Sequence, residues 1–136
     1  MARAVAFGAL AALAMAGPAF GDAATSVGDS GVRITDGAAL YQHICQGCHM
    51  PGGRGAVGAG AFPKLAGDPK LVAANYPVMM VLNGHGAMPW FNGVLSDVQI
   101  ANVVNFVRGS FGNSYPDKVT PADVAALRGP PPHMER

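Results

Sequence analysis

The longest periodic segment of the chain predicts a helix over residues 97–108, in which apolar positions recur every three to four residues. Ser96 and Gln99 form the capping-box pattern that opens a helix, and Gly109 is suited to end it. Two apolar stripes on this helix can face the core of the protein: Val98, Ala101 and Val104, or Ile100, Val103 and Val107. The pattern therefore indicates an amphipathic helix packed against the rest of the domain.

Four further helices are expected where a capping residue precedes an apolar segment or a glycine or proline follows one. They cover residues 36–44, a short stretch that starts at Asp68-Pro69, residues 77–82, and residues 121 to about 129. No segment of the sequence alternates apolar and polar residues over the length that a half-buried strand requires. The expected fold class is therefore all-α.

The start of the chain has the pattern of a secretory signal peptide. Residues 1–3 give a short positive end, residues 4–16 are apolar apart from one glycine, and small residues suited to cleavage follow. The apolar run is shorter than the roughly 20 residues of a transmembrane helix, and an uncleaved membrane anchor is the alternative. We divide the chain into a signal peptide (1–23), a flexible lead-in (24–34), a folded domain (35–129) and a Pro-rich tail (130–136).

Charge and cysteine content narrow the classes of function. The 136-residue chain has a formal net charge of +1 and no basic stripe, so nucleic acid is not an expected partner. Its two cysteines, Cys45 and Cys48, lie three positions apart, and a disulfide between them would constrain little of the unfolded chain. These cysteines are therefore candidates for chemistry rather than for stabilisation.

The segment from Ile44 to Gly58 carries two motifs that imply different ligands. Residues 45–49, CQGCH, fit the pattern of covalent haem attachment, and residues 53–58, GRGAVG, fit that of a dinucleotide-binding turn. A dinucleotide turn follows a buried strand and opens a helix, and neither is expected here. The glycine-rich stretch is then either a flexible surface loop or a loop that passes close to a flat cofactor.

The haem motif agrees with helical geometry. On a helix Cys45 and Cys48 lie at positions i and i+3 and His49 at i+4, so all three share one face. The two thiols can then form thioether bonds to the haem vinyl groups while the imidazole reaches the iron. A zinc site would need about four ligands, and a thioredoxin-like cysteine pair would need a strand–helix–strand setting. We therefore expect one covalently attached haem c.

With these residues, the chain from Gly31 to Arg128 resembles the class I (mitochondrial-type) mono-haem cytochromes c. Four segments carry the likeness in the right order: the helix 36–44, CQGCH at 45–49, FPKLAG at 62–67, and GHGAMP at 84–89 ahead of the long helix. MPWF at 88–91 and GNSYP at 112–116 are similar, more narrowly, to small cytochrome subunits of exported bacterial dehydrogenases. The resemblance implies a few helices wrapped around one haem, with Phe106 packed where the long helix crosses the first helix near Gly37.

His49 is the expected ligand on one side of the iron, and Met88 is the candidate for the other. Met88 is flanked by glycine and proline in a predicted loop, and its thioether is a soft ligand that raises the reduction potential of haem. His85, in the same loop, is the rival ligand. Met79 and Met80 are expected in the core, on the short helix before that loop.

Two accessory roles are also expected, the first of them implied by the resemblance. The carbonyl oxygen of Pro63 would accept a hydrogen bond from the second ring nitrogen of His49, which would fix the orientation of the ring. An ordinary loop proline is the alternative. Trp90 is a candidate contact at the haem edge, with packing in the core as the alternative.

The expected function is electron transfer in the periplasm, by a protein that is not itself an enzyme. The expected partners are redox proteins, with a dehydrogenase as the electron donor and a terminal electron acceptor. A free shuttle between respiratory complexes is the alternative to a subunit bound to the dehydrogenase. A haem enzyme or gas sensor would need an open sixth position on the iron, and a thiol–disulfide oxidoreductase would need free thiols at Cys45 and Cys48.

Overall fold

The computed structural model describes residues 32–58 and 60–131. The predicted signal peptide, most of the predicted lead-in and the end of the Pro-rich tail lie outside the described residues. None of the helices in the described ranges combines the length and the apolar character needed to cross a membrane.

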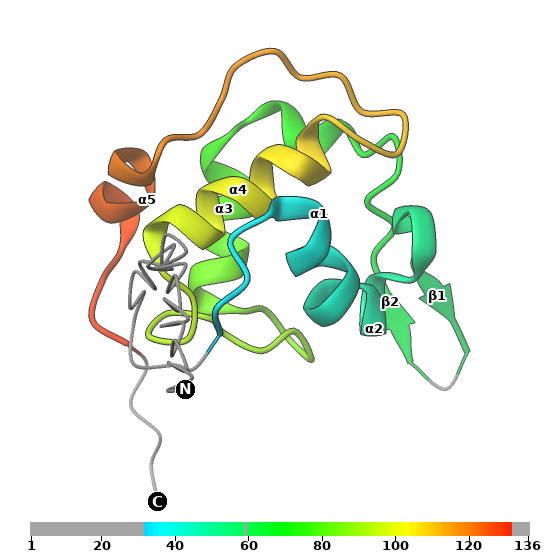
Figure 1. Cartoon of the computed structure of the whole chain (residues 1–136). Coiled ribbons are helices and arrows are strands. Elements are labelled where there is room, and N and C mark those ends of the chain that lie inside the picture. Colours follow the sequence, from blue (N-terminus) through cyan, green and yellow to red (C-terminus); the bar gives the residue numbers. More distant parts are fainter. Residues whose placement is uncertain (1–31, 59, 132–136) are drawn as a thin grey trace, which may run out of the picture.

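The described chain is mainly helical, and α4 lies among the other helices (Figure 1). The long helix α4 contacts α1, α3 and α5. The elements in chain order are α1 (Gly37–Leu40), the π-helical turn η1 (Tyr41–Cys45), α2 (Gln46–His49), the 3-10 turn η2 (Pro51–Gly53), β1 (Ala56–Val57), β2 (Ala61–Phe62), the 3-10 turn η3 (Pro69–Val72), α3 (Asn75–Asn83), α4 (Asp97–Arg108) and α5 (Pro121–Leu127).

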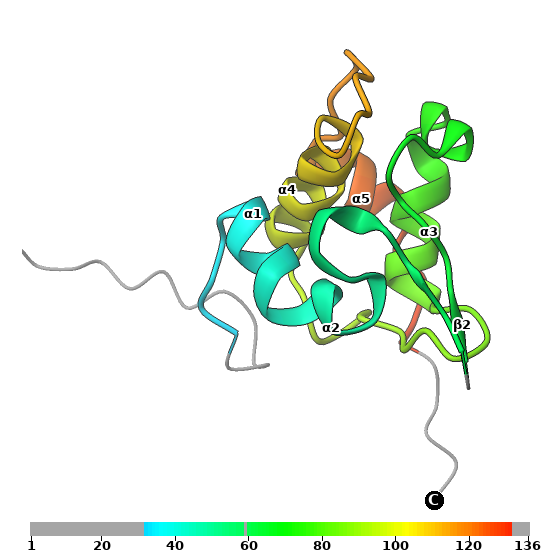
Figure 2. The same cartoon turned by 90° about the vertical axis from the view of Figure 1, so that its right-hand side faces the viewer.

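The expected helices are present, and one small element was not expected. β1 and β2 form an antiparallel pair of two-residue strands, with Ala56 opposite Phe62. This hairpin projects from one end of the molecule, beside α2 (Figures 1 and 2). Strands of two residues are too short to show an alternating pattern, which is why the sequence did not predict them.

The first helix is capped as predicted but is not uniform. The side chain of Asp36 accepts a hydrogen bond of 2.8 Å from the backbone nitrogen of Ala39 and so caps α1. A π-helical turn follows, in which the N–H of Gln46 bonds to the carbonyl of Tyr41, and α2 continues from there to His49. The haem motif therefore lies where a π-turn passes into an α-helix, a feature that often marks functional sites.

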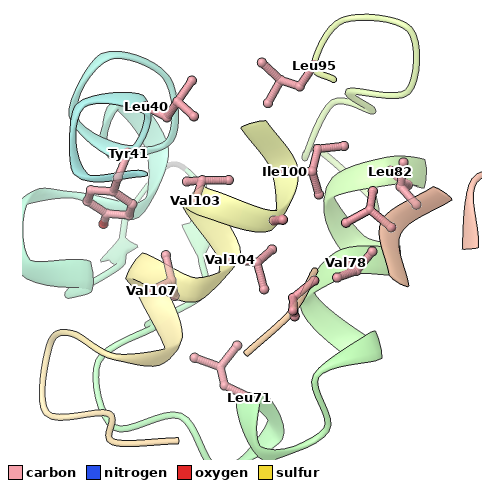
Figure 3. Close-up of a cluster of buried hydrophobic side chains, with 13 residues drawn as sticks. Leu40, Tyr41, Leu71, Val78, Leu82, Leu95, Ile100, Val103, Val104 and Val107 are labelled. Atoms are coloured by element: carbon pink, nitrogen blue, oxygen red, sulfur yellow. The ribbon is translucent and has the colours of Figure 1, made fainter. Parts of the chain in front are cut away.

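Both apolar stripes that the sequence allowed on α4 contribute to the core, because Ala101 and Val104 of the first stripe are buried along with the second stripe. Val98 is 42% exposed, whereas Ile100, Val103 and Val107 are buried. Figure 3 shows buried side chains of α4 lying between those of α1 and η1 on one side and those of α3 on the other: Ile100, Val103, Val104 and Val107 of α4, Leu40 and Tyr41, and Val78 and Leu82. α4 therefore forms the centre of the core.

The crossing of α1 and α4 is confirmed at the predicted residues. A Cβ atom at Gly37 would lie 2.3 Å from the carbonyl oxygen of Asn102 and 3.0 Å from Cβ of Phe106. Only glycine allows the two backbones to approach this closely. The contact places the haem motif, at the end of the same helical segment, against the central helix.

Residues 32–34 are packed rather than flexible, in contrast to the predicted lead-in. The buried amide of Gln99 donates hydrogen bonds of 2.8 Å to the carbonyl of Val32 and 2.7 Å to that of Ile34. These bonds satisfy a polar side chain that would otherwise be buried at a free-energy cost. The packed domain thus includes residues before the predicted boundary at residue 35.

After α4 the chain runs across one side of the molecule to α5, drawn in orange and red in Figure 1. Arg108, at the end of α4, is 1% exposed, and its guanidinium contacts the carboxylate of Asp117 at 2.8 Å. Asn105 bonds through both ends of its amide to the backbone of Val119. These side chains fix the C-terminal segment, residues 109–131, to the core.

Candidate functional site

All the predicted haem-site residues except Trp90 line a single cavity of about 240 Å³. α4 contributes three buried valines to its wall, and the other walls come from the haem motif, the loop after β2, α3 and the loop after α3. Among its lining residues are Cys45, Cys48, His49, Pro63 and Met88. Five residues from three separate segments of the sequence therefore meet in one apolar space.

His49 is held in one orientation by the residue that the resemblance indicated. Its Nδ1 lies 2.9 Å from the carbonyl oxygen of Pro63, and His49 itself is only 8% exposed. A carbonyl oxygen only accepts hydrogen bonds, so Nδ1 must carry the proton and donate it. This tautomer leaves Nε2 as the ring nitrogen with a lone pair for a metal.

The backbone turns sharply just after His49, and a buried tyrosine fixes the turn. Met50 has φ of 64°, which is uncommon for a residue with a side chain. The hydroxyl of Tyr41 donates a hydrogen bond of 2.7 Å to the Met50 carbonyl, and burial raises the pKa of that hydroxyl. Sequence analysis missed this role of Tyr41, because residues nine positions apart give no local signal of the contact.

One glycine supports the Pro63 carbonyl. Gly55 has φ of 67°, and a Cβ there would lie 2.5 Å from the Phe62 carbonyl oxygen and 2.9 Å from the Pro63 carbonyl carbon. The N–H of Gly55 also donates to the His49 carbonyl at 2.9 Å. Gly55 is thus required by the close approach of two backbone segments, a use that the sequence analysis did not consider for the glycine-rich loop.

The Met88 loop is supported by a glycine in the same way. Gly84, which ends α3, has φ of 67°, and a Cβ there would lie 2.5 Å from the Met88 carbonyl oxygen and 2.8 Å from the Trp90 nitrogen. His85 and Met88 exchange backbone hydrogen bonds of 3.1 and 3.0 Å across the turn. The backbone that carries Met88 is therefore fixed against the end of α3.

Two rivals for the place of Met88 also line the cavity. His85 is exposed, whereas Met88 is half-buried. Met80 is half-buried and faces the cavity, and Met79 is 36% exposed, so the prediction that both belong to the core was wrong. The register of α3 explains this, because Pro77, Val78 and Leu82 occupy its buried face.

Trp90 belongs to the same loop as Met88, and its contact with a haem edge stays a prediction. The residues on either side of it, Pro89 and Phe91, line the cavity, but Trp90 is not among the lining residues in the described part of the chain. It is half-buried. Phe91 is therefore the aromatic residue of this loop that can contact a ligand in the cavity.

The environment of the Cys45 thiol does not suit thiol–disulfide exchange. Cys45 and Cys48 are not joined by a disulfide. Burial raises the pKa of the Cys45 thiol to about 11, with a further contribution from the nearby Cys48. Redox cysteines have lowered pKa values, because the thiolate is the reactive form.

The residues that line the cavity fit a haem c. Two thiols adjacent to an oriented imidazole provide the attachment and one axial ligand, and thioether sulfur is available from the loop after α3. Most of the remaining lining residues are apolar, as the faces of a porphyrin require. In the described ranges, no cluster of three or more His, Cys, Asp or Glu side chains that would hold a metal ion directly is found.

Comparison with known proteins agrees with the fold. Residues 32–107 match the family described as cytochrome c oxidase, cbb3-type, subunit III. The cytochrome c subunit of quinone alcohol dehydrogenase from Gluconacetobacter polyoxogenes is 41% identical over 105 residues, which are 68% of this chain and 22% of that protein. The cytochrome c subunit of gluconate 2-dehydrogenase from Pantoea cypripedii is 38% identical over 107 residues, 68% of this chain and 24% of the relative.

A shorter relative matches over most of its own length. Cytochrome c6 from Alaria esculenta is 32% identical over 77 residues, which are 56% of this chain and 90% of that protein. In contrast, the chain spans less than a quarter of the length of the two dehydrogenase subunits. The expected cytochrome c fold is confirmed, and the chain belongs to the cytochrome c family.

Proposed function

We propose that the chain holds one haem c in the cavity, through thioether bonds from Cys45 and Cys48. When bound, the haem supplies an iron that cycles between the ferric and ferrous states. The support for one haem is that the chain contains two cysteines, both in a single C-x-x-C-H motif, and that both line the cavity. Covalent attachment also keeps the cofactor in place in an exported protein.

His49 and Met88 are the proposed axial ligands. The Pro63 carbonyl holds the His49 ring so that Nε2 is available, and this second contact also increases the basicity of the ligand. Met88 is preferred to His85 because its side chain is less exposed, and to Met80 because the family resemblance places the ligand in this loop. A histidine–methionine pair favours the reduced state and raises the reduction potential.

The proposed activity is the transfer of single electrons, with no substrate bound to the iron. The observation that carries it is the hydrogen bond from His49 to Pro63 in an apolar cavity that Met88 also lines. An apolar wall would exclude water, and two protein ligands would leave no position on the iron for a substrate. The chain is then an electron carrier and not an enzyme.

The proposed partners are a dehydrogenase that donates electrons and a terminal acceptor, in the periplasm. The dehydrogenase cytochrome subunits among the relatives support the first partner, and the signal-peptide pattern of residues 1–23 supports the compartment. A free shuttle is the second candidate, and it is favoured by the cytochrome c6 relative, which this chain covers over 90% of its length. Purification from native periplasm at low and at high salt separates the two: a bound subunit copurifies with a dehydrogenase, and a free shuttle purifies alone.

A reductive titration of the purified holoprotein tests the carrier function. We expect one electron per chain in a single reversible step, with a haem that stays attached after denaturation in acid. Substitution of both cysteines by serine is expected to abolish this attachment. A second step, or haem that is extracted from the unsubstituted protein by acid, would contradict the proposal.

A further inference from the structure

We propose that Arg128, the residue after α5, is a positioning residue for the loop that carries Met88. The inference rests on the proposed ligation of the iron by Met88. It assigns a role in the haem site to the C-terminal segment, which lies outside the matched family region of residues 32–107.

The guanidinium of Arg128 makes three contacts with residues that follow Met88 in the chain. Its Nη1 donates to Oδ1 of Asn92 at 2.7 Å, and its Nη2 donates to the carbonyl of Leu95 at 3.0 Å. Its Nε donates to Oδ1 of Asp97 at 2.7 Å, where α4 begins. One side chain thus connects the end of the Met88 loop with the first residue of the central helix.

Asn92 is the point where the loop, α3 and the C-terminal segment meet. It is 2% exposed, and while its Oδ1 accepts from Arg128, its Nδ2 donates to the carbonyl of Gly129 at 2.9 Å. Its backbone nitrogen donates to the carbonyl of Leu82 at 3.2 Å, and that of Phe91 to Val81 at 2.9 Å. Both ends of a buried side chain therefore depend on the C-terminal segment.

The consequence for Met88 follows from the chain path. The loop runs from Gly84 to Asn92. Its first end is fixed at Gly84, where α3 ends, and its second end is fixed by the backbone hydrogen bonds of Phe91 and Asn92. If the bonds from Arg128 are lost, the buried Asn92 is left without its charged partner, and the second end of the loop opens more often. A methionine on such a loop leaves the iron more often, because the thioether–iron bond competes with this motion.

The test compares holoproteins that carry Arg128→Met and Arg128→Lys with an Asn105→Ala control. The control loosens the same C-terminal segment at a different point, because the side chain of Asn105 bonds only to the backbone of Val119. Two quantities are measured: the rate at which carbon monoxide binds to the reduced protein, and amide exchange at Phe91 and Asn92. Arg128→Lys keeps the charge but not the three-way geometry, so it provides a folded variant if Arg128→Met is unstable.

We expect Arg128→Met to raise both rates about tenfold or more, the scale of losing charge-assisted hydrogen bonds. We expect both rates in Arg128→Lys to lie between those of Arg128→Met and those of the unsubstituted protein. Asn105→Ala is expected to leave both rates unchanged. Unchanged rates in Arg128→Met, or an equal increase in Asn105→Ala, would overturn the inference. Rapid carbon monoxide binding by the unsubstituted protein would refute the Met88 ligation itself, while amide exchange would still decide whether Arg128 holds the loop.

Discussion

At the scale of single residues, two glycines fix the backbones that carry the proposed axial ligands. Gly55 lies against the Pro63 peptide and Gly84 against the Met88 peptide, each with φ of 67°. Gly52 lies near Gly55 in the sequence, and Gly86 lies near Gly84. Both of these neighbours also have a positive φ, but a Cβ built on either of them meets nothing within 4 Å. These pairs separate backbone strain from steric contact, because only one member of each pair would clash.

Gly84→Ala is expected to weaken the ligation by Met88, whereas Gly86→Ala is not. Both substitutions place an alanine at a positive φ, which costs about 1–3 kcal/mol. Gly84→Ala adds about 1–3 kcal/mol, because its Cβ would lie 2.5 Å from the Met88 carbonyl oxygen. Urea unfolding measures the loss of stability in each variant, and carbon monoxide binding to the reduced protein measures the release of Met88. Equal carbon monoxide binding by the two variants would contradict this role of Gly84.

Gly55→Ala is expected to break the hydrogen bond from His49 to Pro63. The added Cβ would lie 2.9 Å from the carbonyl carbon of Pro63 and displace that peptide. The His49 Nδ1 proton should then exchange faster with solvent in an NMR experiment, and the reduction potential should shift. Gly52→Ala is the control, because Gly52 also has a positive φ, of 70°, and it should leave the His49 Nδ1 proton protected. Faster exchange of this proton in Gly52→Ala would argue against a specific contact at Gly55.

The sequence predicted the site residues that carry their own chemical pattern. Cys45, Cys48 and His49 follow from a local motif, and the Pro63 contact follows from the family resemblance. The contact from Tyr41 to Met50 could not be predicted, because it depends on how the chain turns after His49. The same reason applies to Gly55 and Gly84, whose need for glycine arises only where distant backbones approach.

At the scale of elements, the close crossing of α1 and α4 carries the haem motif onto the central helix. The two helices approach most closely at Gly37, where a built Cβ would lie 2.3 Å from the Asn102 carbonyl oxygen. Around it lies an aromatic cluster of Tyr41, Phe106 and Phe111, with ring centroids 4.9–5.7 Å apart. Pairs in this geometry add to stability beyond the area that they bury.

Gly37→Ala is therefore expected to destabilise the protein by about 1–3 kcal/mol through overpacking at the crossing. Gly47→Ala is the matched helical control, because a Cβ at Gly47 meets nothing within 4 Å. Alanine there should be neutral or stabilise by up to about 1 kcal/mol, since it favours the helix. Urea unfolding of the holoproteins measures both changes. A Gly37→Ala variant as stable as Gly47→Ala would show that the crossing is not tightly packed.

Helix starts were predictable because capping is local, whereas the buried face of α4 was not fully predictable. The capping boxes of Ser96 with Gln99 and Thr120 with Asp123 are both present. The sequence offered two apolar stripes as alternatives, whereas tertiary packing buries both of them except for Val98. The π-turn at Tyr41–Cys45 has no sequence signature in this chain, since the residues are compatible with an ordinary helix.

At the scale of the whole molecule, a buried arginine attaches the C-terminal segment to the core. Arg108 is 1% exposed and bonds to the carbonyls of Leu71, Val72 and Asp117, in addition to the Asp117 carboxylate. Arginine is seldom fully buried, so a position in the interior could not be predicted for this residue from the sequence. Such side chains are stabilised only by partners that the complete fold supplies.

Asp117→Asn is expected to lower stability at neutral pH and to have a smaller effect in acid. The side-chain hydrogen bond from Arg108 lowers the pKa of the Asp117 carboxyl from its ordinary value of 3.8. A carboxyl with a lowered pKa contributes stability above that ordinary value and loses it as the pH falls through the folded-state pKa. The difference in urea midpoint between the two proteins should therefore narrow well below pH 3.8. A difference that stays constant with pH would contradict this assignment.

The central claim is that His49 and Met88 hold both axial positions of one haem, and carbon monoxide binding tests it most directly. The visible spectrum of the reduced holoprotein is recorded with and without carbon monoxide, beside Met88→Ala and the matched control Met80→Ala. We predict no rapid spectral change for the unsubstituted protein and for Met80→Ala, and a rapid, full shift to a carbonyl spectrum for Met88→Ala. A rapid shift in the unsubstituted protein would mean an open iron site and would favour a haem enzyme or gas sensor. A shift in Met80→Ala alone would assign the ligand to α3 in place of the loop.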